Sequence, residues 1–212
     1  MNFNWVKTNR LIKKVFKKLI WDIPNSDNKI FLTFDDGPIP EVTEWVLDLL
    51  KNEEIRATFF CIGDNIRKHP EVYKRILSEG HQTGNHTFNH LNGWKTETNH
   101  YIDNFKLCET EILKLNAEHS FLFRPPYGKI KPSQSKAIRQ FGYKIIMWDV
   151  LSYDFDSTIS AEKCLENAIS NTEQGSIIVF HDSLKAEKNM KYALPKAIQI
   201  LKDKGFVFDV IS

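Results

Sequence analysis

From residue 30 onward, short apolar runs alternate with segments whose apolar residues recur at helical spacing. The runs are rich in β-branched and aromatic residues and end at turn residues, which is typical of buried strands. They predict strands over residues 30–34, 57–62, 81–85, 121–123, 143–148, 176–180 and 206–211. The amphipathic segments predict helices over residues 41–52, 70–79, 97–115, 133–141, 161–171 and 192–204. Because repeated strand–helix units form parallel sheets, the predicted fold class is α/β: a distorted (β/α) barrel of about seven parallel strands.

Residues 5–21 follow another pattern. Pairs of apolar residues every four positions alternate with cations, which predicts a basic amphipathic helix. The cations are Lys7, Arg10, Lys13, Lys14, Lys17 and Lys18. We expect this helix either to make weak contact with an anionic membrane surface or to pack on the barrel with its lysines in solvent. The predicted organisation is therefore a basic N-terminal segment over residues 1–28 and a barrel over residues 29–212.

Composition narrows the range of functions. The formal net charge of +2 over 212 residues argues against a general nucleic-acid binder, which needs a strongly basic face. Three widely spaced cysteines, Cys61, Cys108 and Cys164, are expected to be reduced and buried. The lysines interrupt every candidate secretory segment, and no apolar run reaches the ~18 residues of a membrane span. By sequence alone we expect a cytoplasmic or membrane-surface location, and no pattern indicates an oligomeric state.

Polar residues stand at the ends of five predicted strands. They are Asp35, Asp36, His86, His90, Arg124, Asp149 and His181. Because the carboxyl ends of parallel strands meet on one face of a barrel, we expect these side chains to converge. Asp35 and Asp36 are adjacent, and neighbouring strand residues point in opposite directions. A turn beginning at Gly37 would bring both carboxylates into one cleft.

His86 and His90 are separated by four positions. On a helical turn the two imidazoles share one face and suit two nitrogen ligands of one divalent metal. With Asp36 as the third ligand, the set leaves a position open for water, as in catalytic metal sites. Zn²⁺ is the first expectation, and Co²⁺, Fe²⁺, Ni²⁺ and Mn²⁺ suit the same ligands.

Five segments of this chain resemble, in order, the motifs of the polysaccharide deacetylase family, the NodB homology domain of carbohydrate esterase family 4. They are Thr33-Phe-Asp-Asp-Gly-Pro38, His86-Thr-Phe-Asn-His90, Arg124-Pro-Pro-Tyr-Gly128, Asp149 with Ser152-Tyr-Asp154, and Val179-Phe-His181. The resemblance extends from about residue 29 to the C-terminus. It implies a distorted barrel and metal-dependent removal of acetyl groups from N-acetylated sugars.

The resemblance also implies a role for each matching residue. Asp36, His86 and His90 would hold the metal. Asp35 would be the base that activates the attacking water, with Arg124 holding it. His181 would be the acid that protonates the leaving amine, paired with and tuned by Asp149. The backbone N–H of Tyr127 would bind the oxyanion. The chain departs from the family pattern at Phe155, where Trp is usual, and at Val179, where Leu is usual.

The expected partner is an N-acetylated glycan of the chitin oligosaccharide or peptidoglycan type. Such polymers lie outside the cell, which is in tension with the missing export signal. Two alternatives stay open: a hydrolase of another linear or cyclic amide on the same fold, and a catalytically weak sugar-binding or membrane-surface protein. Trp94 suits sugar stacking and packing equally, and Trp148 suits packing better.

Overall fold

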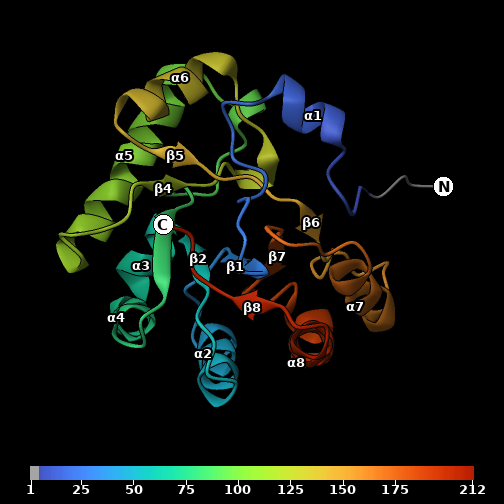
Figure 1. Cartoon of the computed structure of the whole chain (residues 1–212). Helices are drawn as coiled ribbons and strands as arrows, with labels where there is room; N and C mark the ends of the chain where they lie inside the picture. The colour runs from blue at the N-terminus through green and yellow to red at the C-terminus, as the bar shows by residue number, and fades with distance from the viewer. Residues whose placement is uncertain (1–4) are drawn as a thin grey trace.

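The structure is a computed structural model that describes residues 5–212, and it contains one curled parallel sheet surrounded by helices (Figure 1). The strands are β1 (Lys29–Asp35), β2 (Thr58–Cys61), β3 (Gln82–Asn85), β4 (Leu122–Phe123), β5 (Lys144–Ile145), β6 (Val150–Leu151), β7 (Ile177–His181) and β8 (Val207–Phe208). Their order is β5-β4-β3-β2-β1-β7-β6, and β8 pairs with β1. All seven predicted strands are present. The short β6 is additional, because the predicted run 143–148 leaves the sheet after β5.

The helices cover the outside of the sheet (Figure 1). They are α1 (Arg10–Val15), α2 (Val42–Asn52), α3 (Gly63–Lys68), α4 (Pro70–Ser78), α5 (Thr98–Leu115), α6 (Pro132–Gln140), α7 (Ala161–Ser170) and α8 (Glu187–Asp203), with single 3₁₀ turns η1 (Gly93–Lys95) and η2 (Pro126–Gly128). Beyond the N-terminal segment, α3 was not expected, and α8 begins five residues earlier than predicted. The first residues of α8 are mostly polar, so the apolar periodicity that predicts a helix is not visible at its start.

The central strand β1 shows why the sheet has two buried faces. Ile30, Leu32 and Phe34 belong to the main core, packed with residues of the surrounding helices, whereas Phe31 lies in a second cluster with residues of β2, β4 and β7. A strand buried on both faces reads as a continuous apolar run. In register, Asp35 lies opposite Phe60 of β2 and His181 of β7, so the carboxyl ends of these strands meet at one rim. The three cysteines are free and buried, as predicted.

The N-terminal segment is not the continuous helix predicted over residues 5–21. Only α1 is helical, because the backbone on either side is hydrogen-bonded to the sheet. Lys7 pairs with Val150 in an antiparallel bridge, and Ile20 pairs with Ile146 in a parallel one. The segment therefore packs on the barrel beside β5 and β6. None of the helices within residues 5–212 is both long enough and apolar enough to cross a bilayer.

Two of the lysines in this segment are not free in solvent. The Nζ atoms of Lys7 and Lys13 each lie 2.5 Å from a carboxylate oxygen of Asp149, which is fully buried. The Ser176 hydroxyl donates to the same carboxylate over 2.6 Å. A buried carboxylate needs such partners to offset its loss of hydration. The division at residue 28 stays a prediction from sequence pattern.

Candidate active site

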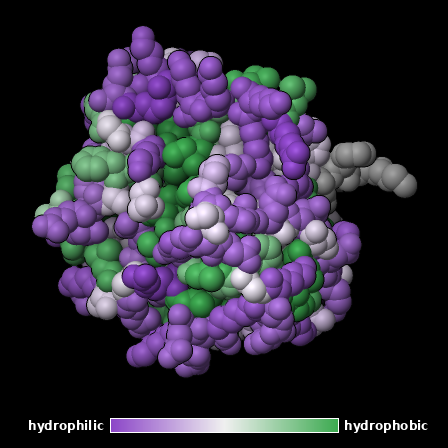
Figure 2. All heavy atoms as spheres, viewed as in Figure 1, coloured by the Kyte–Doolittle hydropathy of each residue, from purple (hydrophilic) through white to green (hydrophobic). Residues whose placement is uncertain are grey.

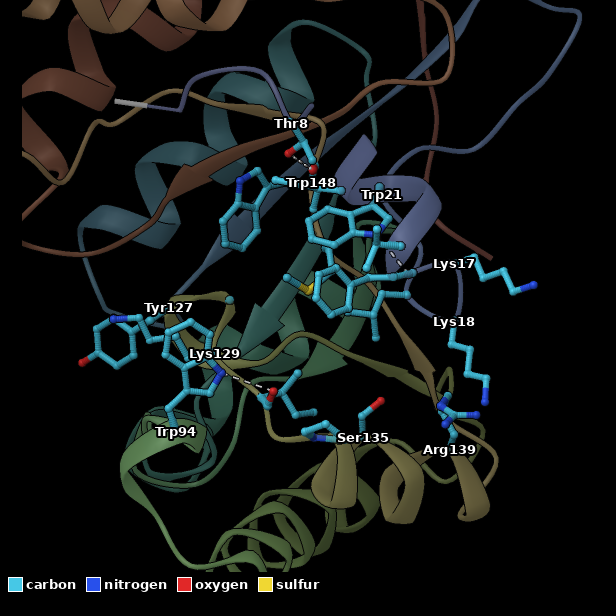
Figure 3. A pocket seen from close by; sticks show the side chains of 18 of the residues that line it. Thr8, Lys17, Lys18, Trp21, Trp94, Tyr127, Lys129, Ser135, Arg139 and Trp148 are labelled. Atoms are coloured by element: carbon cyan, nitrogen blue, oxygen red, sulfur yellow. Dashed lines mark hydrogen bonds between the residues drawn. The ribbon is translucent and has the colours of Figure 1, made fainter. Parts of the chain in front are cut away.

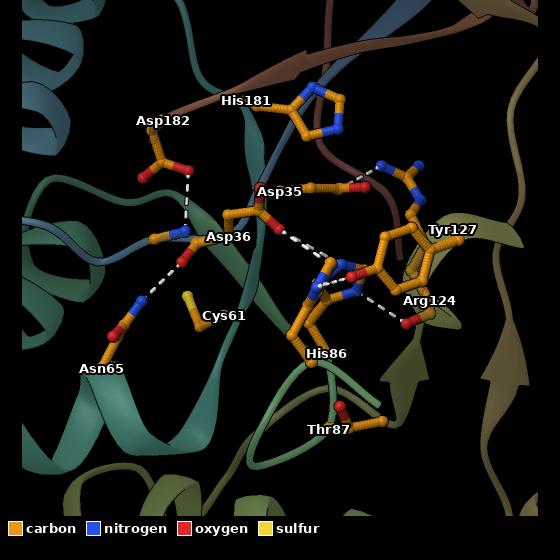
Figure 4. Close-up of polar contacts among 12 residues, drawn as sticks. Asp35, Asp36, Cys61, Asn65, His86, Thr87, Arg124, Tyr127, His181 and Asp182 are labelled. Carbon is orange, nitrogen blue, oxygen red and sulfur yellow. Dashed lines mark hydrogen bonds and ion pairs between the residues drawn. The ribbon is translucent and has the colours of Figure 1, made fainter. Parts of the chain in front are cut away.

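The first feature of the site is the turn that follows β1. Asp36 has a φ of 84°, so the chain leaves the extended conformation directly after Asp35. The Gly37 N–H donates to Asp182 Oδ1 over 3.0 Å, and a Cβ at residue 37 would lie 1.9 Å from Asp182 Oδ2. Only glycine permits this close approach. As expected, the turn leaves the side chains of Asp35 and Asp36 close to one another in the same site (Figure 4).

Asp36, His86 and His90 lie together, and one candidate ligand atom from each falls within 4.8 Å of the others. Residues 86–90 bring the two imidazoles together without forming a helical turn, because this segment is an irregular loop after β3. Thr87 and His90 have positive φ angles, which fold the loop back on itself. The side chain of Asn104 on α5 accepts from the backbone of residues 88 and 89, at 2.9 and 3.1 Å.

Hydrogen bonds orient the two imidazoles toward Asp36. His86 Nδ1 lies 2.7 Å from the carbonyl oxygen of Arg124, so it carries the proton and leaves Nε2 with a free lone pair. His90 Nδ1 lies 3.1 Å from the Tyr127 hydroxyl. The Nε2 atoms are 3.7 Å (His86) and 3.2 Å (His90) from Asp36 Oδ1. Metal-ligating histidines typically use their second nitrogen in this way.

The donor set fits a divalent cation. Asp36 Oδ1 is buried and has no hydrogen-bond partner within residues 5–212. Burial lowers the pKa of His86 to about 4, so its imidazole is neutral, as a ligand must be. Burial raises the Asp36 pKa, but the surrounding histidines lower it by more, and the group stays ionised. Two nitrogens and one carboxylate oxygen form a ligand set suited to Zn²⁺ and similar ions.

Asp35 is held by a buried arginine. Arg124 Nη1 donates to Asp35 Oδ1 over 2.6 Å and to Thr33 Oγ1 over 2.7 Å, and Arg124 is fully buried. Its Nη2 donates to the carbonyl of Met147 over 3.0 Å. The guanidinium is therefore fixed by several acceptors, and it holds the Asp35 carboxyl group in place. This is the pairing that the sequence predicts.

His181 ends β7 on the other side of β1, and its partner is Asp154. His181 Nδ1 lies 2.8 Å from Asp154 Oδ1, and the His181 backbone N–H donates to Asp154 Oδ2 over 2.6 Å. The predicted pairing of His181 with Asp149 is therefore wrong. The Asp149 N–H donates to Ile177, four residues before His181 along β7. At ~3.3 Å per residue that is about 13 Å away, too far for a contact.

Asp154 keeps His181 charged. Burial lowers the pKa of this histidine, but the attraction and hydrogen bond of Asp154, with smaller contributions from Asp36 and Asp35, raise it to about 9. His181 is thus an imidazolium at neutral pH with Nε2 free to donate. The sequence offers both Asp149 and Asp154 near the end of a predicted strand, and the register of β6 with β7 places the second aspartate next to His181.

We expect Asp154→Asn to move the alkaline limb of the rate profile. A general acid works only while protonated, so activity falls as pH rises through its pKa. Without Asp154, the limb should move from about 9 toward the ordinary histidine value of about 6.5. The measurement is kcat/KM against pH.

Asp149→Asn is the matched control. It should leave the alkaline limb in place and instead lower the free energy of unfolding by about 3 kcal/mol, because it removes the partner of Lys7 and Lys13. If the alkaline limb moved in Asp149→Asn and not in Asp154→Asn, Asp149 would be the partner of His181, as predicted from the sequence.

Two further residues complete the site. Tyr127 lies in η2 with a φ of 60°, and its backbone N–H forms no hydrogen bond within the described part of the chain. It is thus available to an anionic oxygen, the role that the sequence predicts. Asp182 was missed by the sequence analysis; it is buried, accepts from Gly37 and Thr43, and burial raises its pKa to about 8. It supports the turn that carries Asp36.

Comparisons with known proteins identify relatives of the whole chain. Residues 22–146 match the family model described as polysaccharide deacetylase. A peptidoglycan-N-acetylglucosamine deacetylase of Bacillus cereus is 33% identical over 91% of this chain and 90% of the relative. Chitin deacetylase 2 of Saccharomyces cerevisiae is 34% identical over 81% of this chain and 55% of the relative.

Solved structures agree in fold. The crystal structure of the Bc1960 peptidoglycan N-acetylglucosamine deacetylase, in complex with a benzamide ligand, superimposes with a TM-score of 0.88 at 33% identity, covering 96% of this chain and 95% of that one. A family 4 carbohydrate esterase from Streptomyces lividans, in complex with acetate, gives a TM-score of 0.79 at 27% identity, covering 87% and 93%. Fold, ordered motifs and relatives agree, and the chain belongs to the polysaccharide deacetylase family.

Proposed function

We propose that this protein removes N-acetyl groups from a GlcNAc-containing glycan of the peptidoglycan or chitin oligosaccharide type, acting as a hydrolase of a non-peptide carbon–nitrogen bond. The observation that carries the proposal is the arrangement at the rim: the Asp36–His86–His90 triad lies beside Asp35, a carboxylate fixed by Arg124, and Asp35 pairs in register with His181, an imidazolium fixed by Asp154. Relatives named for both glycan types support the substrate class. A cell-envelope location follows from such a substrate.

The reaction needs a proton acceptor, a proton donor and stabilisation of charge on the acetamide oxygen. Asp35 takes the proton of the attacking water, and Arg124 orients its carboxyl group through the 2.6 Å ion pair. His181 donates its Nε2 proton to the departing nitrogen, since an amine leaves only when protonated. The Tyr127 N–H stabilises the developing oxyanion. The pKa of His181, about 9, suits an acid that must be protonated at neutral pH.

Asp36, His86 and His90 would hold the cation, with Zn²⁺ proposed first and Co²⁺, Fe²⁺, Ni²⁺ and Mn²⁺ as substitutes. A bound divalent cation lowers the pKa of water to about 7 and polarises the carbonyl group. The protein contributes the rest of the site by orienting each imidazole through its second nitrogen and by bringing Asp35 and His181 to the same rim on the neighbouring strands β1 and β7.

Acetate release tests the proposal. We expect the protein to release acetate from chitin oligosaccharides or peptidoglycan fragments, to lose this activity in chelator, and to regain it with Zn²⁺ or Co²⁺. Binding of Zn²⁺ without acetate release from any N-acetylated sugar would favour hydrolysis of another linear or cyclic amide. Sugar binding without release of acetate or of any other product would favour a non-catalytic sugar-binding protein.

A further inference from the structure

Residues 5–21 contain six cations and no acidic residue, and the structure divides these cations into two groups. Lys7 and Lys13 turn inward to Asp149. The other four are exposed and form no ion pair within the described residues: Arg10, Lys14, Lys17 and Lys18. Packing on the barrel therefore neutralises two charges and leaves four directed to solvent.

Exposed apolar side chains lie beside these four cations. Leu11, Val15 and Phe16 of the α1 region are 68%, 65% and 52% exposed, and Trp5 is 56% exposed. Figure 2 shows apolar atoms next to hydrophilic ones over the region of α1 at the upper right. Contiguous exposed apolar groups mark an interaction surface rather than ordinary solvent-facing residues.

This surface continues into a groove of about 930 Å³ between α1 and α6. Trp21, Trp94 and Trp148 contribute to its apolar wall, and among residues 5–212 no acidic residue lines it. Its cations are Lys17, Lys18, Lys129, Lys136 and Arg139. In Figure 3, Lys17, Lys18 and Arg139 lie toward one end of the groove, and Trp94 and Tyr127 toward the other. The groove thus combines an apolar wall with a wholly cationic charge set.

The surface is held in place before anything binds. Thr8 donates through its N–H to the carbonyl of Asp149 and through its hydroxyl to that of Trp148, both over 2.8 Å. The Asn9 side chain caps α1 by accepting from Leu11 over 2.8 Å. Binding would therefore not require this segment to fold first, which lowers its entropic cost.

We propose that α1 and the groove beside it dock on an anionic phospholipid bilayer. Interleaved lysines and apolar side chains, with tryptophans at the edge, match the headgroup boundary, where charge and apolar burial act together. Tyr127 lines the groove and its hydroxyl contacts His90, so docking would place the candidate active site close to the membrane. If the proposed function holds, which this consequence requires, the substrate would be a glycan at the membrane surface.

Vesicle pelleting of the full chain tests the proposal without any glycan, so its result is independent of deacetylase activity. We expect binding to phosphatidylcholine vesicles containing about 30% phosphatidylglycerol, and little binding to phosphatidylcholine alone. The triple variant Lys14→Gln/Lys17→Gln/Lys18→Gln should bind on the order of 100-fold more weakly, since each lysine near an anionic surface contributes about fivefold. High salt should weaken wild-type binding in the same direction.

A matched triple variant, Lys51→Gln/Lys188→Gln/Lys204→Gln, removes three exposed lysines from α2 and the two ends of α8, away from α1 in Figure 1. It should bind within about twofold of wild type. Leu11→Ser should weaken binding severalfold, whereas Leu107→Ser, at a helical leucine that is 52% exposed on α5, should not. Melting temperatures would verify that all variants fold.

Several results would overturn the proposal. One is failure of the wild type to pellet with anionic vesicles. Another is an equal loss of vesicle binding in both triple variants, which would show that the vesicles attract the positive charge of the protein as a whole and not the α1 surface. Retention by soluble polyphosphate but not by vesicles would identify a polyanion as the occupant. Self-association lost in Leu11→Ser, without vesicle binding, would identify a second copy of the chain.

Discussion

His86→Ala is expected to abolish stoichiometric binding of Zn²⁺ and, with it, deacetylation. The imidazole Nε2 is one of three candidate ligand atoms, and its orientation is fixed by the bond from Nδ1 to the Arg124 carbonyl. Loss of residues that merely orient a ligand costs 10–100-fold in metal affinity, so loss of a ligand should cost more than about 100-fold. Isothermal calorimetry with Zn²⁺ measures this loss directly, without substrate.

The design needs controls because His86 is buried and its removal leaves a cavity. His90→Ala removes a second candidate ligand from a partly exposed position and should give the same loss of binding. His100→Ala removes an exposed histidine of α5 and should leave the stoichiometry unchanged. Melting curves in chelator would separate unfolding from ligand loss. Full Zn²⁺ occupancy in folded His86→Ala and His90→Ala would contradict the triad assignment.

The convergence of the site could be predicted because it follows from strand ends alone. β1, β3, β4 and β7 are parallel strands of one sheet, so the residues at their carboxyl ends reach the same rim. For that reason Asp35, Arg124 and His181 were placed correctly without any side-chain geometry. The family and the fold were likewise predicted and confirmed.

The errors concern backbone that leaves the regular strands. Asp149 and Asp154 are five residues apart in an irregular stretch around the two-residue strand β6, and only the register of β6 with β7 shows which one reaches His181. The His86–His90 loop depends on positive φ angles and on Asn104, which is distant in sequence. Contacts between residues so distant in sequence leave no local pattern in the amino-acid sequence from which they could be predicted.

The N-terminal segment illustrates a second limit. Its apolar spacing predicts a helix, yet Lys7 and Ile20 are drawn into bridges with the sheet, and tertiary hydrogen bonds outweigh helix propensity. The partners of the buried Asp149 were not predicted for the same reason. Lys7 and Lys13 precede the barrel in the sequence but pack against it in the fold. The role of Asp149 therefore cannot be predicted without the N-terminal lysines, nor the role of these lysines without Asp149.

Asp35→Asn should keep the metal and lose turnover by roughly 10²–10⁴-fold, the usual contribution of a general base. The asparagine has almost the same shape, and its carbonyl oxygen can still accept from Arg124 Nη1, now 2.6 Å from Asp35 Oδ1. What it lacks is the ability to take a proton from water. The loss corresponds to about 3–5 kcal/mol of transition-state stabilisation.

Measuring kcat, KM and Zn²⁺ affinity for each variant distinguishes a general base from a metal ligand. In Asp35→Asn, kcat should fall while KM and the calorimetric Zn²⁺ affinity change little, whereas His86→Ala loses the metal itself. Asp48→Asn, at a 65% exposed carboxylate on α2, controls for the loss of one negative charge. Unchanged turnover in Asp35→Asn would remove this residue from the mechanism. Because Asp36 would be bound to the cation and Asp154 is paired with His181, Asp182 would then be the remaining carboxylate of the site to test, and its burial beneath Gly37 makes it a poor acceptor for a proton from water.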